Sequence, residues 1–314
     1  MRIFLSIDEI DQDFGPCVLS VGNFDGVHRA HLEVLQRVVA SARHLSAKSL
    51  ALTFEPHPLR VLRPGLDFKL LSPLTEKLRL LQETGLDAVL VISFDKEFSQ
   101  LTAEQFAIDI LGRKLKAAEV HVGENFRFGR GAAGDVGILS VLAAQAPFGL
   151  VIYPEMQFRG EIVSSSRIRK LLQIGDVSRA RHLLGHPFYI AGQTEPGEGL
   201  GRSQTVPTVN LKAYPELLPG NGVYITAAKI AGECLHSVTN VGYRPTFENR
   251  GLGVETHLLE SPPEEIPAGT RVELLFFLRL RAEIKFSSAE ALRGQITRDV
   301  AKARRWVNLQ TRLG

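Results

Sequence analysis

Two histidines near the start of the chain have types and spacing that suit phosphate chemistry. His28 and His31 follow the segment Gly22-Asn23-Phe24-Asp25-Gly26-Val27, where an apolar run gives way to a helical pattern. Residues three apart share one side of a helix, so both imidazoles face the same side of its first turn. A helix N-terminus attracts anions through free N–H groups and its dipole. The pair predicts a site for a phosphate that gains charge during transfer; a helix cap beside a surface histidine is the alternative.

A serine- and arginine-rich segment repeats this arrangement. Ser164-Ser165-Ser166-Arg167 precedes the apolar pair Leu171-Leu172. Serine is a strong N-cap, and capping alone is the simpler explanation. Arginines in a first turn oppose the helix dipole, however, which makes sense mainly if an anion binds there. The segment is therefore a second candidate phosphate site.

The segment Thr53-Phe54-Glu55-Pro56-His57-Pro58 ends the next apolar run. Its two prolines stiffen the loop, and its aromatic faces could hold a planar ring. A rigid turn without a ligand is the alternative.

A glycine-rich segment raises the possibility of dinucleotide binding. Gly129-Arg130-Gly131-Ala132-Ala133-Gly134 matches GxGxxG and precedes a helical pattern. Asn125-Phe126-Arg127-Phe128 separates these glycines from the preceding strand, however, so the tight strand–turn–helix geometry is missing. We therefore reject a dehydrogenase.

The second half carries a glycine loop and three polar residues in strand-like patterns. Gly201-Arg202 closes the loop, and Pro207-Thr208-Val209-Asn210 follows. Thr208 and Asn210 alternate across Val209, so on a strand both point to one face, as oxygen ligands of Mg²⁺ should. Glu255 lies in an apolar strand pattern and could act as a general base toward a hydroxyl; a solvent-facing charge is the alternative. The chain has no GxxxxGK[ST], so P-loop chemistry is excluded.

The elements of the first half indicate a parallel sheet. Apolar strand-like runs alternate with helical patterns, which is typical of a sheet covered on both faces. Ligands of such sheets bind beyond the carboxyl ends of the strands. The expected strands are 17–22, 49–54, 87–93, 119–123 and 148–153, and the expected helices are 29–45, 75–84, 103–111 and 136–144.

The character of the chain changes near Leu184-Gly185-His186-Pro187. Closely spaced strands without intervening helices indicate an antiparallel barrel or sandwich. We therefore expect two domains, 1–184 and 185–314. The strands expected in the second are 188–193, 222–230, 235–241, 253–259 and 271–280, with a final helix at about 287–309.

Composition sets broad bounds on the protein. The chain has 314 residues, 44% of them hydrophobic, and a net charge of +3. Cys17 and Cys234 are its only cysteines, which excludes a disulfide framework and a thiolate metal site. No basic stripe with interleaved aromatic residues indicates a nucleic-acid partner, and no apolar run is long enough for a membrane span. The acidic N-terminal segment argues against a secretory signal, so we expect a cytoplasmic location. Nothing indicates an obligate protein partner.

In this order the segments resemble the bacterial bifunctional riboflavin kinase/FMN adenylyltransferase (FAD synthetase) family over nearly the whole chain. The resemblance rests on Gly22–His31, Thr53–Pro58, Val122–Gly129 and Ser164–Arg169 in the first half. In the second half it rests on Gly201-Arg202, Pro207–Asn210, Asn240–Phe247, Val254–His257 and Leu280–Phe286. It implies an N-terminal α/β nucleotidyltransferase domain, Rossmann-like with a doubly wound parallel sheet. A C-terminal riboflavin kinase-like antiparallel β-barrel with a terminal helix would follow.

The resemblance implies two sets of roles. In the adenylyltransferase half, His28, His31 and Asn125 would contact ATP phosphates, helped by Ser164, Ser165 and Arg167, with Gly22, Asn23, Phe24 and Asp25 in the nucleotide loop. Phe54, Pro56, His57, Pro58 and Phe128 would shape the flavin pocket. In the kinase half, Thr208 and Asn210 would hold Mg²⁺ with ATP. Glu255 would take the proton of the riboflavin 5′-hydroxyl, and Gly201, Arg202 and Arg281 would complete the ligand site.

The implied substrates and products are riboflavin, FMN, FAD and ATP. The sequence departs from the family pattern at Ala30, which replaces a motif glycine, and at Thr205 and Ser261 in the kinase half. These departures leave two alternatives open. One is an FMN adenylyltransferase with an impaired kinase domain, and the other is a flavin- or nucleotide-binding regulator without turnover.

Overall fold

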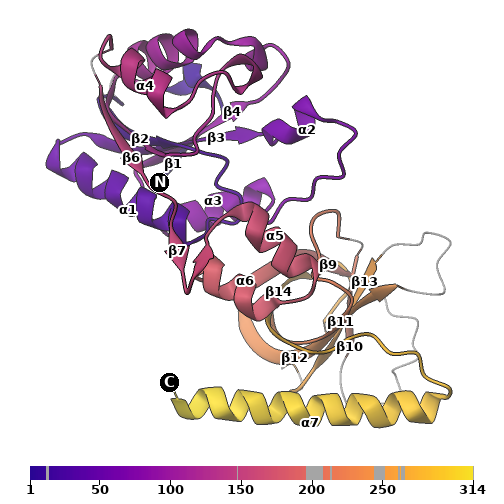
Figure 1. The fold of residues 1–314 in the computed structure, drawn as a ribbon. Coiled ribbons are helices and arrows are strands. Elements are labelled where there is room, and N and C mark those ends of the chain that lie inside the picture. Colours follow the sequence, from indigo (N-terminus) through magenta and orange to yellow (C-terminus); the bar gives the residue numbers. More distant parts are fainter. Residues whose placement is uncertain are drawn as a thin grey trace. The chain divides into compact units, whose positions relative to one another are not determined.

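The computed structural model describes residues 1–11, 14–146, 148–195, 208–212, 214–243, 252–260, 262 and 266–313. By its internal contacts the chain divides into two compact units, Met1–Ser165 and Ser166–Gly314. Figure 1 draws the ribbon of both.

The first unit is built on a parallel sheet of six strands in the order β1-β4-β3-β2-β5-β6. Its central strands are apolar and buried on both faces, as a sheet covered by helices requires. The predicted parallel sheet is confirmed, and the structure adds β1, a three-residue edge strand too short to show a sequence pattern. The strands are β1 (Arg2–Phe4), β2 (Cys17–Val21), β3 (Lys48–Glu55), β4 (Ala88–Ser93), β5 (Ala117–Gly123) and β6 (Gly149–Tyr153).

Helices cover both faces of this sheet. Figure 1 shows α1 (Arg29–His44) and α3 (Leu74–Gln82) below it and α4 (Val136–Ala143) above it. The helix expected at 103–111 is a π-helix, η3 (Gln105–Lys114). Shorter pieces are α2 (Pro58–Leu62), the hairpin β7 (Gln157–Phe158) and β8 (Glu161–Ile162), and the 3₁₀ turns η1 (Ile7–Glu9), η2 (Phe98–Gln100) and η4 (Arg130–Ala132).

The strand order of the first sheet defines where a ligand can bind. From β2 the chain proceeds outward through β3 and β4, and later returns to the other side of β2 with β5 and β6. The connections after β2 and β5 therefore diverge, and the general rule for such sheets predicts a ligand crevice at the carboxyl ends of these two strands. The loops that begin at residues 22 and 124 follow these carboxyl ends.

The second unit is a closed antiparallel barrel in the order β10-β13-β12-β11-β14-β9. This confirms the predicted barrel. Its strands are β9 (Phe188–Glu195), β10 (Thr208–Leu211), β11 (Gly222–Ile230), β12 (Glu233–Tyr243), β13 (Leu252–Leu258) and β14 (Arg271–Arg281). The terminal helix α7 (Ala289–Leu313) packs Ala303, Val300 and Trp306 against Val223 and Val238 on the outside of the barrel.

Two helices precede the barrel in sequence and pack against it. In α6 (Val177–Leu184), the Ser178 hydroxyl donates to Phe277 O at 3.1 Å, and the Arg181 guanidinium lies 5.6 Å from the Phe277 ring centroid. Arg279 on β14 donates to Ile174 O, just after α5 (Ser165–Gln173), at 3.1 Å. Helices α5 and α6 thus belong to the barrel unit by contact, although the sequence changes character only near residue 185.

Candidate active sites

The loop after β2 is held in place by a buried carboxylate. Asp25 is 1% exposed, and its oxygens accept hydrogen bonds from the Leu71 and Ser72 N–H groups at 2.9–3.1 Å. The Ser72 hydroxyl in turn accepts from Gly26 N at 2.9 Å. Asp25, predicted to contact the nucleotide, therefore fastens its loop to the segment that leads into α3. The loop begins beside β3, where Asn23 O accepts from the Thr53 hydroxyl at 3.2 Å.

The two histidines lie together at the start of α1. His28 is the N-cap and is buried, and its Nδ1 accepts from His31 N at 3.4 Å. The two rings stack with centroids 3.6 Å apart. Burial and the neighbouring His28 and Lys77 charges hold the pKa of His31 well below 6.5. The structure therefore confirms the helix cap, because His28 caps α1, whereas the phosphate site stays a prediction.

The end of β3 carries the predicted flavin-binding segment. His57 is the N-cap of α2 and is buried; its Nδ1 accepts from Leu59 N at 3.2 Å, and its ring centroid lies 4.5 Å from that of Phe68. Pro58 is the first residue of α2, whereas Pro56 is exposed. This segment is thus a stiff strand–helix junction at the carboxyl edge of the sheet, and its contact with a flavin stays a prediction.

A row of aromatic rings extends from this junction toward the loop after β5. Phe54 contacts Phe94 and Phe98 with centroids 5.6 and 5.9 Å away. The row continues through Phe98–Phe106, Phe106–Phe128 and the stacked Phe126–Phe128 pair. The predicted Phe128 is 7% exposed and belongs to the core, whereas Phe54, Phe94, Phe98 and Phe126 are half-buried. Sequence analysis missed Phe94 and Phe98, which lie in no motif.

A buried lysine is a further group that the sequence analysis missed. Lys77 on α3 is 1% exposed, and its ammonium donates to Thr53 Oγ1 at 3.3 Å and Phe54 O at 3.4 Å. Burial lowers the pKa of Lys77, and the Glu55 and Asp25 charges partly oppose this effect. A lysine in the buried stripe of an amphipathic helix was the available sequence signal.

The remaining predicted residues of the first site lie in the loop after β5 and at the start of α5. Asn125 is exposed and donates to Glu155 Oε1 at 2.6 Å. The Ser165 hydroxyl donates to Asp25 O at 2.9 Å, so this residue contacts the loop of the histidines directly. Ser164 is half-buried just before α5, and Arg167 is half-buried in the first turn of α5, within the unit that begins at Ser166.

The GxGxxG segment has a structural explanation. Gly129 has φ +73°, and a Cβ there would lie 2.8 Å from Ala103 N. A Cβ on Gly134 would lie 2.8 Å from the Phe128 ring, and Phe128 and Gly134 form a β-bridge. The glycines therefore close a compact loop around Phe128, which agrees with the rejection of a dehydrogenase.

The barrel brings three predicted kinase residues onto one face. Asn210 on β10 lies opposite Glu255 on β13, and Glu255 lies opposite Asn240 on β12. Thr208, two residues before Asn210 on β10, lies opposite His257 on β13. The Thr208 hydroxyl is hydrogen-bonded to His257 Nδ1 at 2.8 Å. Because residues two apart on a strand share a face, all five side chains form one polar row, which is half-buried.

This polar row continues onto β9, where Glu195 lies opposite Asn210. The residues that alternate with this row along the same strands point to the other face and are buried. On that face the Thr239 hydroxyl is hydrogen-bonded to the hydroxyls of Thr226 at 2.7 Å and Thr256 at 3.0 Å. Sequence analysis missed Glu195 and His257 as site residues, because only the register places them beside Asn210 and Thr208.

Two other predicted kinase positions lie outside the described residues, namely Gly201 and Arg202. The departures at Thr205 and Ser261 also lie there. Arg281, predicted to contact the ligand, pairs through Nε with Asp299 Oδ2 at 2.8 Å, and Asp299 is 2% exposed. This buried ion pair joins β14 to α7, which gives Arg281 a structural partner.

The oxygen groups of the polar row suit a hard divalent cation. Thr208 and Asn210 supply neutral oxygens on one face, and such ligands bind Mg²⁺ together with substrate phosphates and water. Within the part of the chain that the structure describes, His, Cys, Asp and Glu form no group of three that could hold a metal ion by themselves. The polar row therefore fits a metal ion that is bound partly by the protein and partly by the phosphates of a nucleotide.

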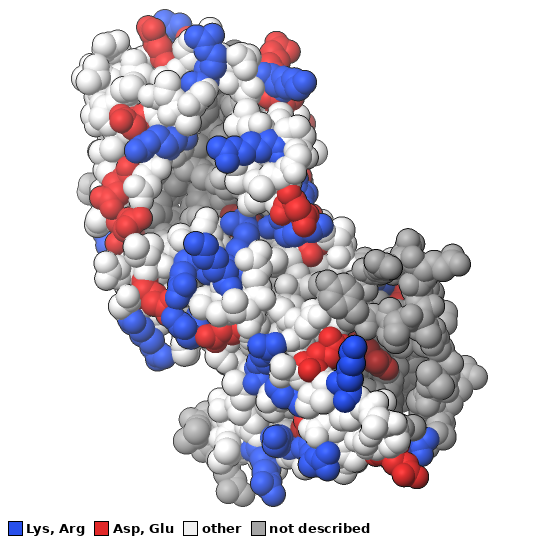
Figure 2. Space-filling model, turned by 45° about the vertical axis from the view of Figure 1, so that its right-hand side comes forward, with Lys and Arg blue, Asp and Glu red and all other residues white. Residues whose placement is uncertain are grey.

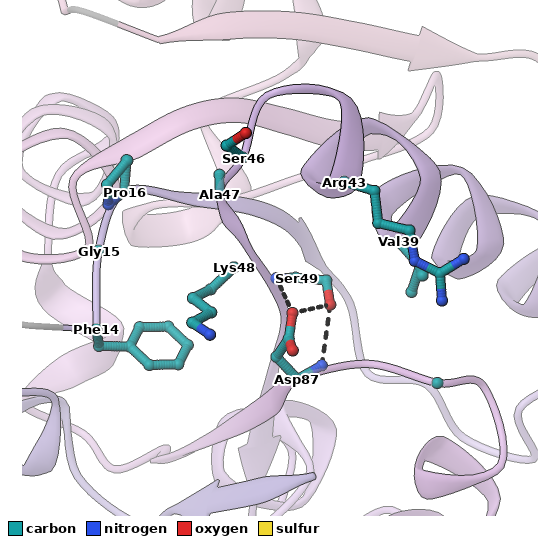
Figure 3. A pocket seen from close by; sticks show the side chains of 11 residues that line it. Phe14, Gly15, Pro16, Val39, Arg43, Ser46, Ala47, Lys48, Ser49 and Asp87 are labelled. Carbon is teal, nitrogen blue, oxygen red and sulfur yellow. Dashed lines mark hydrogen bonds between the residues drawn. The ribbon is translucent and has the colours of Figure 1, made fainter.

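A separate pocket of about 430 Å³ lies at the opposite, amino edge of the first sheet (Figure 3). Arg43 and Lys48 line it, and Asp87 accepts hydrogen bonds from Ser49 N and Oγ at 2.8 and 2.7 Å. Ligands of parallel sheets bind at the other edge, so this pocket is not part of the candidate site. On the face drawn in Figure 2, Lys and Arg alternate with Asp and Glu, in keeping with the small net charge.

Comparison with family models agrees with this division into two sites. The FAD synthetase model matches residues 10–167, and the riboflavin kinase model matches residues 184–307. The chain belongs to the bifunctional riboflavin kinase/FMN adenylyltransferase family. Most of α5 and α6 lies between the two matches.

Curated relatives carry both activities in their names. The chain is 35% identical to the bifunctional riboflavin kinase/FMN adenylyltransferase of Escherichia coli K12, with 93% of each chain covered. It is 32% identical to the Pseudomonas fluorescens protein, with 97% of each chain covered, and 31% identical to the Haemophilus influenzae protein, with 98% of this chain and 100% of that one covered. The expected family is confirmed, and nothing in these matches favours an adenylyltransferase alone.

A crystal structure from Streptococcus pneumoniae, described as a macrolide-efflux protein, shares the fold. It has a TM-score of 0.86 and 25% identity, and the alignment covers 97% of this chain and 98% of that one. Among the helices of the described ranges, none has both the length and the apolar character needed to cross a bilayer.

Proposed function

We propose that the chain phosphorylates riboflavin at the polar row of the barrel and adenylylates the resulting FMN at the crevice of the parallel sheet. ATP is the co-substrate of both steps, and Mg²⁺ is the divalent metal. The observation that supports two separate sites is the placement of two unlike polar clusters in two compact units, each within its own family match.

In the first unit, the start of α1 would bind the ATP phosphates. The helix N-terminus and the His28–His31 pair supply N–H donors and positive potential, and Ser165 braces the loop through Asp25 O. Asn125, Ser164 and Arg167 would approach the same phosphates. An oxygen of the FMN phosphate attacks the α-phosphorus, and pyrophosphate leaves with the electrons of the broken P–O bond. No protein nucleophile is required, so positioning and charge stabilisation provide the catalysis.

The flavin would lie against the half-buried aromatic row. Phe54 begins the row at the end of β3, Phe94 and Phe98 follow β4, and Phe126 lies in the loop after β5. Ring faces and edges of this kind suit a planar isoalloxazine. Pro56, His57 and Pro58 would shape its border, whereas Phe128 supports the row from the core.

In the second unit, Glu255 would act as the general base. It lies beside Asn210 and Asn240, where it can accept the proton of the riboflavin 5′-hydroxyl as that oxygen attacks the γ-phosphorus of ATP. Thr208 and Asn210 would hold Mg²⁺, which supplies charge neutralisation on the phosphates when bound. ADP leaves with the electrons of the broken bond. Gly201, Arg202 and Arg281 would complete the nucleotide and flavin contacts.

The product trace from riboflavin tests this proposal. Purified protein with riboflavin, ATP and Mg²⁺ should yield FMN and then FAD when samples are separated by chromatography. A reaction that stops at FMN would contradict the adenylyltransferase assignment. A reaction that makes FAD only from added FMN would contradict the kinase assignment.

A further inference from the structure

His257 lies in the polar row of the barrel between a polar and an apolar neighbour. Strand β13 lies between β10 and β12, so His257 is opposite Thr208 on one side and Val238 on the other. Val238 is buried and belongs to the apolar cluster beneath α7. Of these two opposite residues, Thr208 is therefore the one that can hydrogen-bond to the ring, and its hydroxyl oxygen lies 2.8 Å from His257 Nδ1.

This hydrogen bond determines how the Thr208 side chain is oriented. The Cβ of threonine carries a hydroxyl and a methyl group, and the χ1 rotamer decides which of the two points in a given direction. The bond to His257 selects a rotamer that places the hydroxyl beside the ring. Thr208 and Asn210 are two apart on β10, so the oxygen that His257 holds lies on the same strand face as Asn210.

The direction of the hydrogen bond matters for a metal ligand. A hydroxyl has one proton to donate and two lone pairs that can accept. When the Thr208 hydroxyl donates to Nδ1, both lone pairs of its oxygen remain for a cation. When Nδ1–H donates instead, one lone pair is used. Groups that hydrogen-bond to a metal ligand commonly orient it and tune its binding in this way.

We propose that His257 is a positioning residue for riboflavin phosphorylation, in which its Nδ1 accepts the Thr208 proton and leaves the lone pairs of the Thr208 oxygen for the divalent metal. This inference rests on the proposed role of Thr208 and Asn210 in holding Mg²⁺. His257 acts through Thr208 alone, which distinguishes it from Glu255, the proposed base. A change at His257 should therefore matter only while the Thr208 hydroxyl is present.

The first test is a double-mutant cycle on FMN formation in the full chain. Thr208→Val removes the hydroxyl at nearly constant volume, and His257→Phe removes the acceptor but keeps a ring. Each change should raise the KM for the Mg²⁺–ATP complex by about tenfold to 100-fold. In the double variant, His257→Phe should add little to the effect of Thr208→Val, because the group on which it acts is already gone.

Two further variants control for the size and chemistry of the ring. His257→Asn keeps an acceptor oxygen on a short side chain and should restore a KM near that of the unchanged protein. His236→Phe is the matched control, because His236 is a half-buried histidine of the same barrel, on β12 opposite Ala227. It should leave the KM for the Mg²⁺–ATP complex unchanged. FAD formation from supplied FMN serves as the internal control for an intact chain.

The second test reads the hydrogen bond directly, without turnover. NMR of the ring nitrogens in the unchanged full chain, without metal or nucleotide at about pH 8, should show neutral His257 with its proton on Nε2. The His257→Asn spectrum identifies the signals by their loss. A proton on Nδ1 would overturn the inference, and this result does not depend on how any other variant folds.

The outcomes separate the inference from the function on which it rests. If Thr208→Val leaves the KM for the Mg²⁺–ATP complex unchanged, the proposed metal role of Thr208 fails and the inference fails with it. If Thr208→Val raises this KM but His257→Phe does not, the metal role stands and the inference is overturned. Effects that multiply in the double variant would likewise overturn it, since they would show that His257 acts independently of Thr208.

Discussion

The two candidate sites of this chain are assembled in different ways. At the first site, polar groups come from the loop after β2, the start of α1, the end of β3, helix α3 and the segment before α5. They meet only because these parts of the chain lie at one edge of the sheet. In the barrel, Asn210, Glu255 and Asn240 sit opposite one another on adjacent strands. The first site depends on tertiary convergence, and the second depends on register.

This difference has a physical consequence. A site built from converging loops needs internal braces, and Asp25 and Lys77 provide them with buried charges. A site built on strands is held by the backbone hydrogen bonds between those strands, so its polar side chains need few additional stabilising contacts. We therefore expect distant changes in the first unit to disturb FAD formation, whereas the barrel site should respond mainly to changes in its own row.

The largest expected effect separates the two sites directly. His28→Ala removes the cap of α1 and one of two imidazoles at the proposed phosphate site. FAD formation from FMN should fall by about 100-fold or more, as when one preorganised donor to a developing charge is lost. FMN formation from riboflavin should persist in the same preparation, which chromatography of both reactions would measure. Equal loss of both activities would contradict two separate sites.

The converse change should affect only the barrel. Asn210→Ala removes one of two proposed metal ligands beside Glu255. Loss of one charge-assisted contact should slow FMN formation by about tenfold to 100-fold. FAD formation from supplied FMN should remain near that of the unchanged protein. A comparable fall in FAD formation would show that the polar row of the barrel also contributes to adenylyl transfer.

A paired glycine substitution tests the dependence of the crevice on loop packing. Gly129 and Gly131 have φ values of +73° and +64°, but an added Cβ would clash with Ala103 only at Gly129. Gly131→Ala should cost about 1 kcal/mol through backbone strain, and Gly129→Ala about 2 kcal/mol or more. Thermal unfolding measures this difference. FAD formation should fall further in Gly129→Ala, while FMN formation stays unchanged in both.

The smallest expected effect concerns the amino edge of the first sheet. Burial acts to raise the pKa of Asp87, but hydrogen bonds from Ser49 outweigh it, and the pKa is lowered from 3.8. A lowered carboxyl pKa adds stability above the unfolded pKa, and this contribution is lost as the pH falls through the folded value. Asp87→Asn should therefore flatten the loss of stability below about pH 4. An unchanged acid profile in denaturant unfolding would rule out this contribution.

Much of the architecture could be predicted because its signals are local. The continuous apolar runs of β2, β3 and β4 indicated a buried parallel sheet, and the short strands after residue 185 indicated the barrel. Elements of two or three residues, such as β1 and β7, have no periodicity to read. The attachment of α6 to the barrel was equally hidden, since an amphipathic helix shows that it has a buried face without showing what covers it.

The sequence by itself determined the residue types and spacings that carry the chemistry. These include His28 and His31 in one helical turn, Thr208 and Asn210 on one strand face, and the ordered segments that identify the family. Only the tertiary structure decided that Asp25 anchors its loop, that Lys77 reaches the end of β3, and that Glu255 lies opposite Asn210. The physical reason is that short spacings fix relations within one element, whereas charges and hydrogen bonds between elements depend on packing and register.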